Sequence, residues 1–153
     1  MSEIKATWVG PGLRLLGEAN AGPAVVMDSG HPPYGTQTGA SPMELVLLGL
    51  AGCTSMDVLS ILAKKREPVT GYQIHVTAER ADTHPKVYTK IHLEYVFYGK
   101  GVRAKSVERA IELSEKTYCG ASAMLSKTAE VTHSYRIVEE EVRPHQPGAI
   151  KSA

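Results

Sequence analysis

The pattern of hydrophobic and polar positions opens with three short runs that have the character of β-strands. They cover residues 4–9, 13–18 and 24–28, and the sequences Gly-Pro-Gly and Asn-Ala-Gly-Pro separate them. Short runs of this kind with glycine and proline between them are typical of neighbouring antiparallel strands. The first part of the chain is therefore predicted to form a small antiparallel meander.

A capping box in front of a long apolar run predicts the start of a helix. Ser41 and Glu44 have the spacing of that motif, and a proline occupies the first helical position between them. The apolar run covers residues 45–63, and the helix should end near Arg66–Glu67 because Pro68 disfavours helical geometry in the residue before it. Since the helix is apolar on most sides, we expect it to be buried within the domain or at a subunit contact.

The second half of the chain switches between periods of two and periods near 3.6. Alternation over 72–80 and 87–98 predicts a long hairpin, helical spacing over 106–118 predicts a helix, and alternation over 131–138 predicts a closing strand. The order of strands, helix, strands, helix and strand is typical of an α+β protein with antiparallel sheets. We expect one domain over residues 1–153, in which 143–153 form a loosely ordered tail.

The long apolar run imitates a membrane span, because Lys64, Lys65 and Arg66 follow it directly. Asp57 argues against a span, since a carboxylate at such a position costs about 2.5–3.5 kcal/mol on an insertion scale. The first residues also lack the apolar stretch of a signal peptide. We expect a cytoplasmic protein with no membrane contact.

Charge and composition narrow the classes of partner. The 153 residues carry 17 Lys and Arg against 16 Asp and Glu, which leaves a formal charge of +1, and 42% are hydrophobic. This hydrophobic fraction is sufficient for a buried core. The net charge is too small to attract a polyanion such as a nucleic acid. We therefore expect no nucleic-acid partner.

Few residue patterns in the chain indicate chemistry. The six histidines lack the spacing of metal ligands, and no phosphate-binding loop or serine-hydrolase signature occurs, so we expect neither a metal nor a cofactor. Two cysteines remain. Cys53 lies within the apolar helix, where a thiol is most often a small hydrophobic side chain, whereas Cys119 lies beside a helix break that could stabilise a thiolate. Spacing alone leaves two structural cysteines and a redox pair both open.

Several segments resemble one protein family. Ser-Pro-Met-Glu-Leu at 41–45, Gly52-Cys53 and Tyr118-Cys119 with the small residues after it resemble the OsmC/Ohr family of thiol-dependent peroxide-reducing proteins. The segments 58–69, 84–86 and 110–114 are similar to its YhfA-like branch. The resemblance covers about residues 8–137 and implies an OsmC-like fold, with antiparallel sheets around a long buried helix in an intertwined homodimer.

The resemblance also implies roles for four residues. Cys53 matches the cysteine that attacks the peroxide, and Cys119 matches the cysteine that resolves the sulfenic acid to a disulfide. Arg14 is the candidate cation that stabilises the thiolate, and Glu44 is its candidate partner, although in the peroxide-resistance members the glutamate directly follows the proline, where this chain has Met43. Glu44 lies nine positions before Cys53, on the opposite helix face, so it can serve only a Cys53 from a second chain.

The function expected from the resemblance is reduction of organic or hydrogen peroxides, with a cellular dithiol as the reductant. An alternative is a redox-sensing or apolar-ligand-binding stress protein, in which the thiols react once without sustained turnover. Such a ligand would lie among four apolar side chains, Met43, Leu47, Leu48 and Met124. A third interpretation, in which the cysteines are distant and purely structural, remains open from sequence.

Overall fold

The computed structural model describes residues 2–140, so the predicted tail at 143–153 lies outside the described residues. The chain divides into two compact units, Met1–Leu48 and Gly49–Ala153, which we describe separately. The prediction of a single domain stays a prediction.

The N-terminal unit contains the predicted meander. Strands β1 (Lys5–Trp8), β2 (Leu15–Glu18) and β3 (Val25–Met27) pair in that order, and both pairings are antiparallel. A tight turn at Gly12 joins the first two, with a φ of +61°, and a Cβ there would overlap the carbonyl oxygen of Tyr34. The same oxygen accepts a hydrogen bond from Leu13 N at 3.1 Å, which ties the turn to the loop that follows β3.

Helix α1 (Pro42–Lys64) begins at the predicted capping box. Ser41 N donates to Glu44 Oε2 at 2.7 Å, and Glu44 N donates to Ser41 Oγ at 3.2 Å. The helix ends two residues before the predicted boundary, and Arg66 has a positive φ of 57°. A residue with left-handed geometry just after a helix is a common C-terminal cap. The helix therefore ends at this turn, ahead of Pro68.

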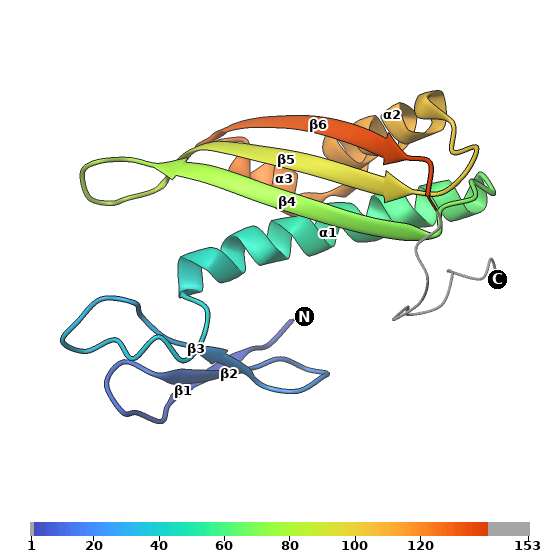
Figure 1. The fold of residues 1–153 in the computed structure, drawn as a ribbon. Coiled ribbons are helices and arrows are strands. Elements are labelled where there is room, and N and C mark those ends of the chain that lie inside the picture. The colour runs from blue at the N-terminus through green and yellow to red at the C-terminus, as the bar shows by residue number, and fades with distance from the viewer. Residues whose placement is uncertain (1, 141–153) are drawn as a thin grey trace. The chain divides into compact units, whose positions relative to one another are not determined.

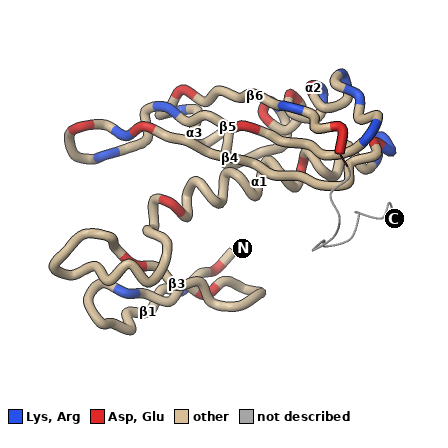
Figure 2. The backbone as a smooth tube through the Cα atoms, viewed as in Figure 1, with Lys and Arg blue, Asp and Glu red and all other residues tan. Residues whose placement is uncertain are grey.

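Only one stripe of α1 is buried. Its buried side chains repeat at helical spacing: Leu50, Ala51, Thr54, Val58 and Leu62. By length and composition the helix is apolar enough to cross a membrane, and 28% of its most apolar window is buried. Figure 2 shows an acidic position at the start of α1 followed by a long uncharged stretch. Within the single chain α1 is therefore not buried on most sides, and its burial at a subunit contact stays a prediction.

The C-terminal unit is built on a second sheet of β4 (Gly71–Arg80), β5 (Tyr88–Tyr98) and β6 (Glu130–Val138). The hairpin of β4 and β5 is antiparallel, as predicted. Strand β6, however, pairs with β5 in parallel, so the prediction of antiparallel sheets is wrong at this pairing. The reason is the long connection between the two strands, whose helices carry the chain back to the starting end of β5.

The connection between β5 and β6 contains three helical segments, α2 (Ala104–Leu113), the π-helical η1 (Ser114–Tyr118) and α3 (Gly120–Leu125). In Figure 1 these helices and the C-terminal part of α1 lie along the sheet. The core between them is made by fully buried side chains from β5 and α2, namely Leu93, Tyr95, Phe97, Val107 and Ile111. The predicted helix 106–118 is thus α-helical only to Leu113.

Candidate active site

Three reactive side chains from two parts of the C-terminal unit meet. Cys53 and Asp57 lie one turn apart on α1, and Cys119 precedes α3. The two sulfurs and a carboxylate oxygen of Asp57 all lie within 4.8 Å of one another. The fold therefore brings together two of the four predicted site residues and adds a carboxylate. Both cysteines are free thiols.

The π-helical turn positions Cys119. Cys119 N donates to Ser114 O at 2.8 Å, across five residues, and Cys119 itself has extended backbone geometry at φ −75° and ψ 100°. Its sulfur then caps α3, because Ser122 N donates to Cys119 Sγ at 3.3 Å. π-turns within helices are frequent at functional sites because they redirect side chains out of the regular spacing. Here the turn directs both Ser114 and Cys119 into the interior.

The thiol of Cys119 is almost fully enclosed, with 2% of its surface exposed. Burial raises its pKa above the ordinary value, because a thiolate loses solvation there. The hydrogen bonds from Ser122 lower the pKa, and the neighbouring Cys53 raises it again. The net direction is upward, so Cys119 is held as a neutral thiol in the reduced protein. Cys53, in contrast, is half-buried.

A chain of buried hydroxyls ends at Asp57. Ser114 Oγ donates to Asp57 Oδ2 at 3.1 Å, and Thr54 Oγ1 lies 2.9 Å from Ser114 Oγ and 2.7 Å from Tyr95 Oη. Each hydroxyl has one proton, and Ser114 donates its own to Asp57, so the donors run in one direction from Tyr95 through Thr54 and Ser114 to Asp57. Burial raises the pKa of Tyr95 well above its usual range, which keeps this first donor protonated.

Sequence reasoning missed the roles of Asp57, Ser114 and Thr54. Asp57 follows Cys53 by four positions, and side chains at that spacing share a helix face. That spacing was the available signal for Asp57. Ser114 had no comparable signal, because its inward direction depends on the π-turn.

Arg14 and Glu44 belong to the N-terminal unit, where they do not form the predicted pair. Arg14 Nε donates to Thr38 Oγ1 at 2.7 Å and Arg14 Nη2 donates to Thr36 Oγ1 at 3.2 Å. Both threonine hydroxyls donate in turn to Asp28 Oδ2. The guanidinium is therefore linked to the buried Asp28 through two hydroxyls, an arrangement that the sequence analysis did not predict.

The hydrogen bonds to Asp28 hold its carboxylate ionised. Thr36 and Thr38 lower its pKa well below the usual range, and burial opposes them only in part. Glu44 is engaged instead with Ser41, whose backbone N–H lowers the pKa of Glu44. Among the ion pairs of residues 2–140, none joins Arg14 to Glu44.

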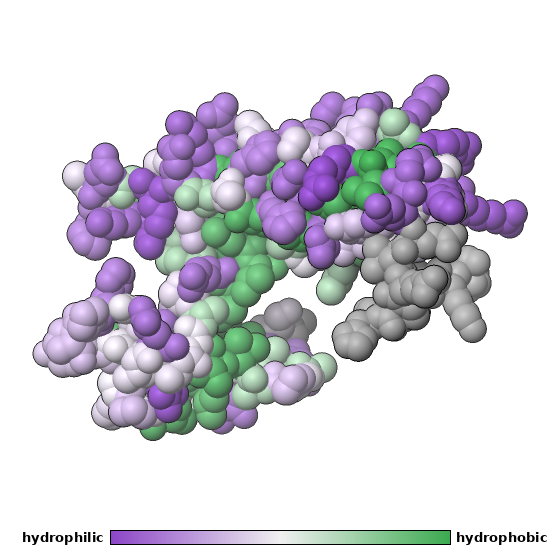
Figure 3. All heavy atoms as spheres, in the orientation of Figure 1, coloured by the Kyte–Doolittle hydropathy of each residue, from purple (hydrophilic) through white to green (hydrophobic). Residues whose placement is uncertain are grey.

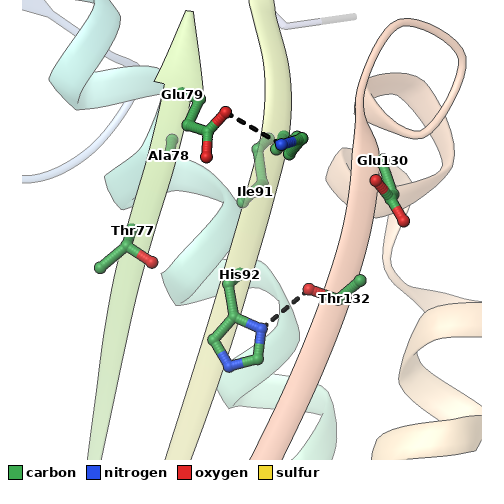
Figure 4. Close-up of a pocket in the computed structure, with 8 residues that line it drawn as sticks. Thr77, Ala78, Glu79, Ile91, His92, Glu130 and Thr132 are labelled. Carbon is green, nitrogen blue, oxygen red and sulfur yellow. Dashed lines mark hydrogen bonds and ion pairs between the residues drawn. The ribbon is translucent and has the colours of Figure 1, made fainter.

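A shallow groove crosses the second sheet on strands β4, β5 and β6 (Figure 4). Two pairs of its polar groups already interact, since Lys90 Nζ lies 3.2 Å from Glu79 and His92 Nδ1 lies 2.8 Å from Thr132 Oγ1. Its volume of about 270 Å³ is below the range of about 300–1,000 Å³ that is usual for small-molecule pockets. The groove contains no thiol, and we place the candidate chemistry at Cys53, Asp57 and Cys119.

The arrangement of the two thiols can perform a defined redox reaction. A half-buried thiol is accessible to a small oxidant, and a second thiol within 4.8 Å can condense with the oxidised product. The third interpretation from sequence, in which the cysteines lie apart, is wrong because of this distance.

Comparison with known proteins places this geometry in a family. The family model described as OsmC-like protein matches residues 35–134. Protein YhfA of Escherichia coli strain K12 is 36% identical over 136 residues, which are 89% of this chain and 98% of that protein. The chain belongs to the OsmC-like family by both measures, as the resemblance predicted.

Solved structures share the fold. A hypothetical protein from Aquifex aeolicus has a TM-score of 0.80 at 30% identity, and the match covers 92% of this chain and 98% of that one. An organic hydroperoxide resistance protein from Elizabethkingia anophelis has a TM-score of 0.65 at 15% identity, with 89% and 96% covered. The second likeness concerns the fold alone. This chain is accordingly a member of the OsmC-like protein family with an α+β fold of two small sheets and helices.

Proposed function

We propose that the protein reduces organic or hydrogen peroxides through a two-cysteine cycle in which Cys53 reacts first and Cys119 resolves. The observation that carries the proposal is the separation of the two sulfurs, which is no more than 4.8 Å. The name of the Elizabethkingia anophelis neighbour, an organic hydroperoxide resistance protein, supports the substrate class.

The cycle consists of two displacements. The thiolate of Cys53 attacks the terminal oxygen of the peroxide, the O–O bond breaks, and the alkoxide leaves as an alcohol after it takes up a proton. Cys53 is then a sulfenic acid. The sulfur of Cys119 attacks that sulfur, a disulfide forms, and the hydroxyl leaves as water. A cellular dithiol returns both cysteines to the reduced state by thiol–disulfide exchange.

The two environments support this assignment of roles. A peroxide must approach the first sulfur from solvent, and Cys53 is half-buried whereas Cys119 is 2% exposed. The raised pKa of Cys119 makes it a poor nucleophile toward peroxide at neutral pH. Resolution is less demanding, because the sulfenic acid forms within reach of the second sulfur and the step is intramolecular.

A thiolate at Cys53 would lie beside the carboxyl group of Asp57, so a nearby cation would stabilise it. None of the ion pairs in the part of the chain that the structure describes involves Asp57. We propose that Arg14 of a second chain takes this role, and that Glu44 of the same second chain contributes only if it leaves its bond to Ser41. The hydroxyls of Thr36 and Thr38 already orient the guanidinium of Arg14.

A homodimer is part of the proposal. Large apolar side chains stay exposed on α1 and on the strands of the N-terminal unit, among them Trp8 (72%), Leu48 (59%) and Met56 (75%). Figure 3 shows apolar surface over both regions. Exposed apolar patches of this kind mark association sites. A second copy of the chain would cover them, and we propose that the dimer works in the cytoplasm, where dithiol reductants are available.

A peroxide-consumption assay with a dithiol reductant tests the function. We expect the parent to turn over many times and Cys53→Ser to lose activity. Cys119→Ser should retain the first reaction with peroxide but accumulate the sulfenic acid. Equal rates for the parent and Cys53→Ser would contradict the proposal. One oxidation per chain without sustained turnover would support the sensing alternative instead.

A further inference from the structure

We propose that the reduced protein binds a thiophilic divalent cation, with zinc as the best fit, through Cys53 Sγ, Cys119 Sγ and a carboxylate oxygen of Asp57. The proposal departs from the expectation drawn from the sequence, in which no ligand spacing was visible. It does not depend on peroxide turnover, because it concerns the reduced thiols before any oxidant is present.

The distances suit such an ion. The three ligand atoms lie within 4.8 Å of one another. Zinc binds sulfur at about 2.3 Å and carboxylate oxygen at about 2.0–2.2 Å, so two sulfurs of a tetrahedral site are about 3.8 Å apart. The present separation exceeds that value by no more than about 1 Å, which small side-chain rotations can remove. Two thiolates and one carboxylate select zinc over magnesium or calcium, which prefer oxygen ligands.

The spacing of two ligands on α1 also suits a metal. Cys53 and Asp57 lie four positions apart on one helix, so both side chains point from the same face. Pairs of ligands at this helical spacing occur in known zinc motifs. Cys119 supplies the third ligand from a different segment, which makes the site dependent on the folded state.

Further hydrogen bonds hold two of the ligands in place. Ser114 Oγ donates to Asp57 Oδ2 at 3.1 Å, which holds this carboxyl group in its orientation. Ser122 N donates to Cys119 Sγ, and N–H donors of this kind stabilise a metal-bound thiolate. The ligand groups are therefore already oriented by their surroundings.

The charge of the cluster favours a cation as well. Binding of the ion would displace the protons of the two thiols, so that three negative groups then surround it. No ion pair among the described residues neutralises Asp57. A divalent ion would offset two of these charges. Three protein ligands would leave the fourth position of a tetrahedral site for water.

Metal binding and disulfide formation would exclude each other. A disulfide joins the two sulfurs at about 2.0 Å and removes both thiolates as ligands. When a peroxide takes two electrons from the two thiolates, it becomes an alcohol and water with two protons from solvent, the disulfide forms, and the ion is released. The reduced protein would therefore hold the ion and the oxidised protein would not.

Titration of the reduced full-length protein with cobalt, without oxygen, tests the site. Cobalt substitutes for zinc and gives a charge-transfer absorption when thiolates bind it. We expect one cobalt per chain, displacement of the absorption by zinc, and its complete loss in Cys53→Ser and Cys119→Ser. No absorption in the parent, or an undiminished one in either cysteine variant, would overturn the proposal.

Two conservative variants test the remaining parts of the site. Asp57→Asn should weaken cobalt binding at least tenfold, and Ser114→Ala should weaken it about 10–100-fold as an outer contact to a ligand. Asp82→Asn, which removes an exposed carboxylate from the β4–β5 loop, is the matched control and should bind as the parent does. Thermal unfolding monitored by circular dichroism checks that each variant folds. Parent-like affinity in a folded Asp57→Asn would overturn the assignment of the carboxylate.

Discussion

The C-terminal unit buries whole aromatic and branched side chains, whereas the N-terminal unit buries a single carboxylate. Leu93, Tyr95 and Phe97 have no exposed surface, but among the described residues 2–48 only Asp28 is buried. A three-stranded sheet without a covered apolar face is marginal on its own in water. The N-terminal unit is therefore organised by hydrogen bonds to Asp28, and its large apolar side chains, such as that of Trp8, stay exposed.

The largest difference between the units should follow truncation of an aromatic side chain in each. Phe97 is fully buried beside Tyr72 and Tyr95, with ring centroids 5.3 and 6.3 Å away. Phe97→Ala should lower the free energy of unfolding by about 3–5 kcal/mol in urea denaturation, because it leaves a cavity. Trp8→Ala, the counterpart in the N-terminal unit, should change it by about 0.5 kcal/mol or less in dilute solution.

The outcome of the Trp8 variant also depends on concentration. A cost for Trp8→Ala that grows with protein concentration would indicate that a second copy covers this side chain. A cost in dilute solution as large as that of Phe97→Ala would contradict the contrast between the two units.

The buried hydroxyl chain offers a second test within the C-terminal unit. Thr54→Val keeps the shape of the side chain but leaves the hydroxyls of Tyr95 and Ser114 without this partner. We expect a loss of about 1–3 kcal/mol in the free energy of unfolding, measured by urea denaturation. Thr77→Val on the exposed face of β4 is the matched control and should lie within about 0.5 kcal/mol of the parent.

Variants of the capping box at the start of α1 should have a smaller effect on stability. Ser41→Ala removes the acceptor for Glu44 N and should cost about 1 kcal/mol of stability by thermal unfolding. Glu44→Gln retains the reciprocal bond to Ser41 and should leave stability near that of the parent. If Glu44→Gln nevertheless slows peroxide reduction, the charge of Glu44 contributes to the reaction at Cys53. If the rate is unchanged, Glu44 serves only as a capping residue.

Acid should loosen the N-terminal unit through Asp28. Its pKa is lowered in the folded protein, so its contribution to stability is complete above the ordinary value of about 3.9 and is lost as the pH falls below that value. Trp8 is the only tryptophan, so its fluorescence reports on this unit. We expect the fluorescence to change below about pH 4. The far-ultraviolet circular dichroism should change only at lower pH, because the stabilisation lost with Asp28 belongs to the N-terminal unit.

The matched control for the acid titration is Asp28→Asn, which cannot titrate. This variant should show the altered fluorescence already at neutral pH, because it cannot provide an ionised acceptor for Thr36 and Thr38. A fluorescence transition in the parent that coincides with global unfolding would contradict a separately organised N-terminal unit.

Local patterns were sufficient to predict most of the elements. The capping box predicted the start of α1, and the alternation over 72–80 and 87–98 predicted the hairpin of β4 and β5, because short-range chemistry decides both features. The parallel pairing of β6 was not predictable in this way. Its direction depends on where the helical connection delivers the chain, which no alternation of side chains encodes.

In the candidate site too, some features were predictable from the sequence and others depend on the fold. The family resemblance identified Cys53 and Cys119, and the fold brings them together. The predicted pairing of Arg14 with Glu44 is absent among the described residues, because Thr36 and Thr38 engage the first and Ser41 engages the second. The π-turn at Ser114–Tyr118 was not predicted either, since its sequence has ordinary helical spacing.

The central claim is that Cys53 and Cys119 form one redox pair within a chain. The most direct measurement is mass spectrometry of the peptides after the reduced protein reacts with one equivalent of peroxide. The proposed cycle predicts a peptide that joins Cys53 to Cys119 in the same chain and disappears on treatment with a dithiol. Two free thiols after the reaction, or a bridge only between different chains, would contradict it.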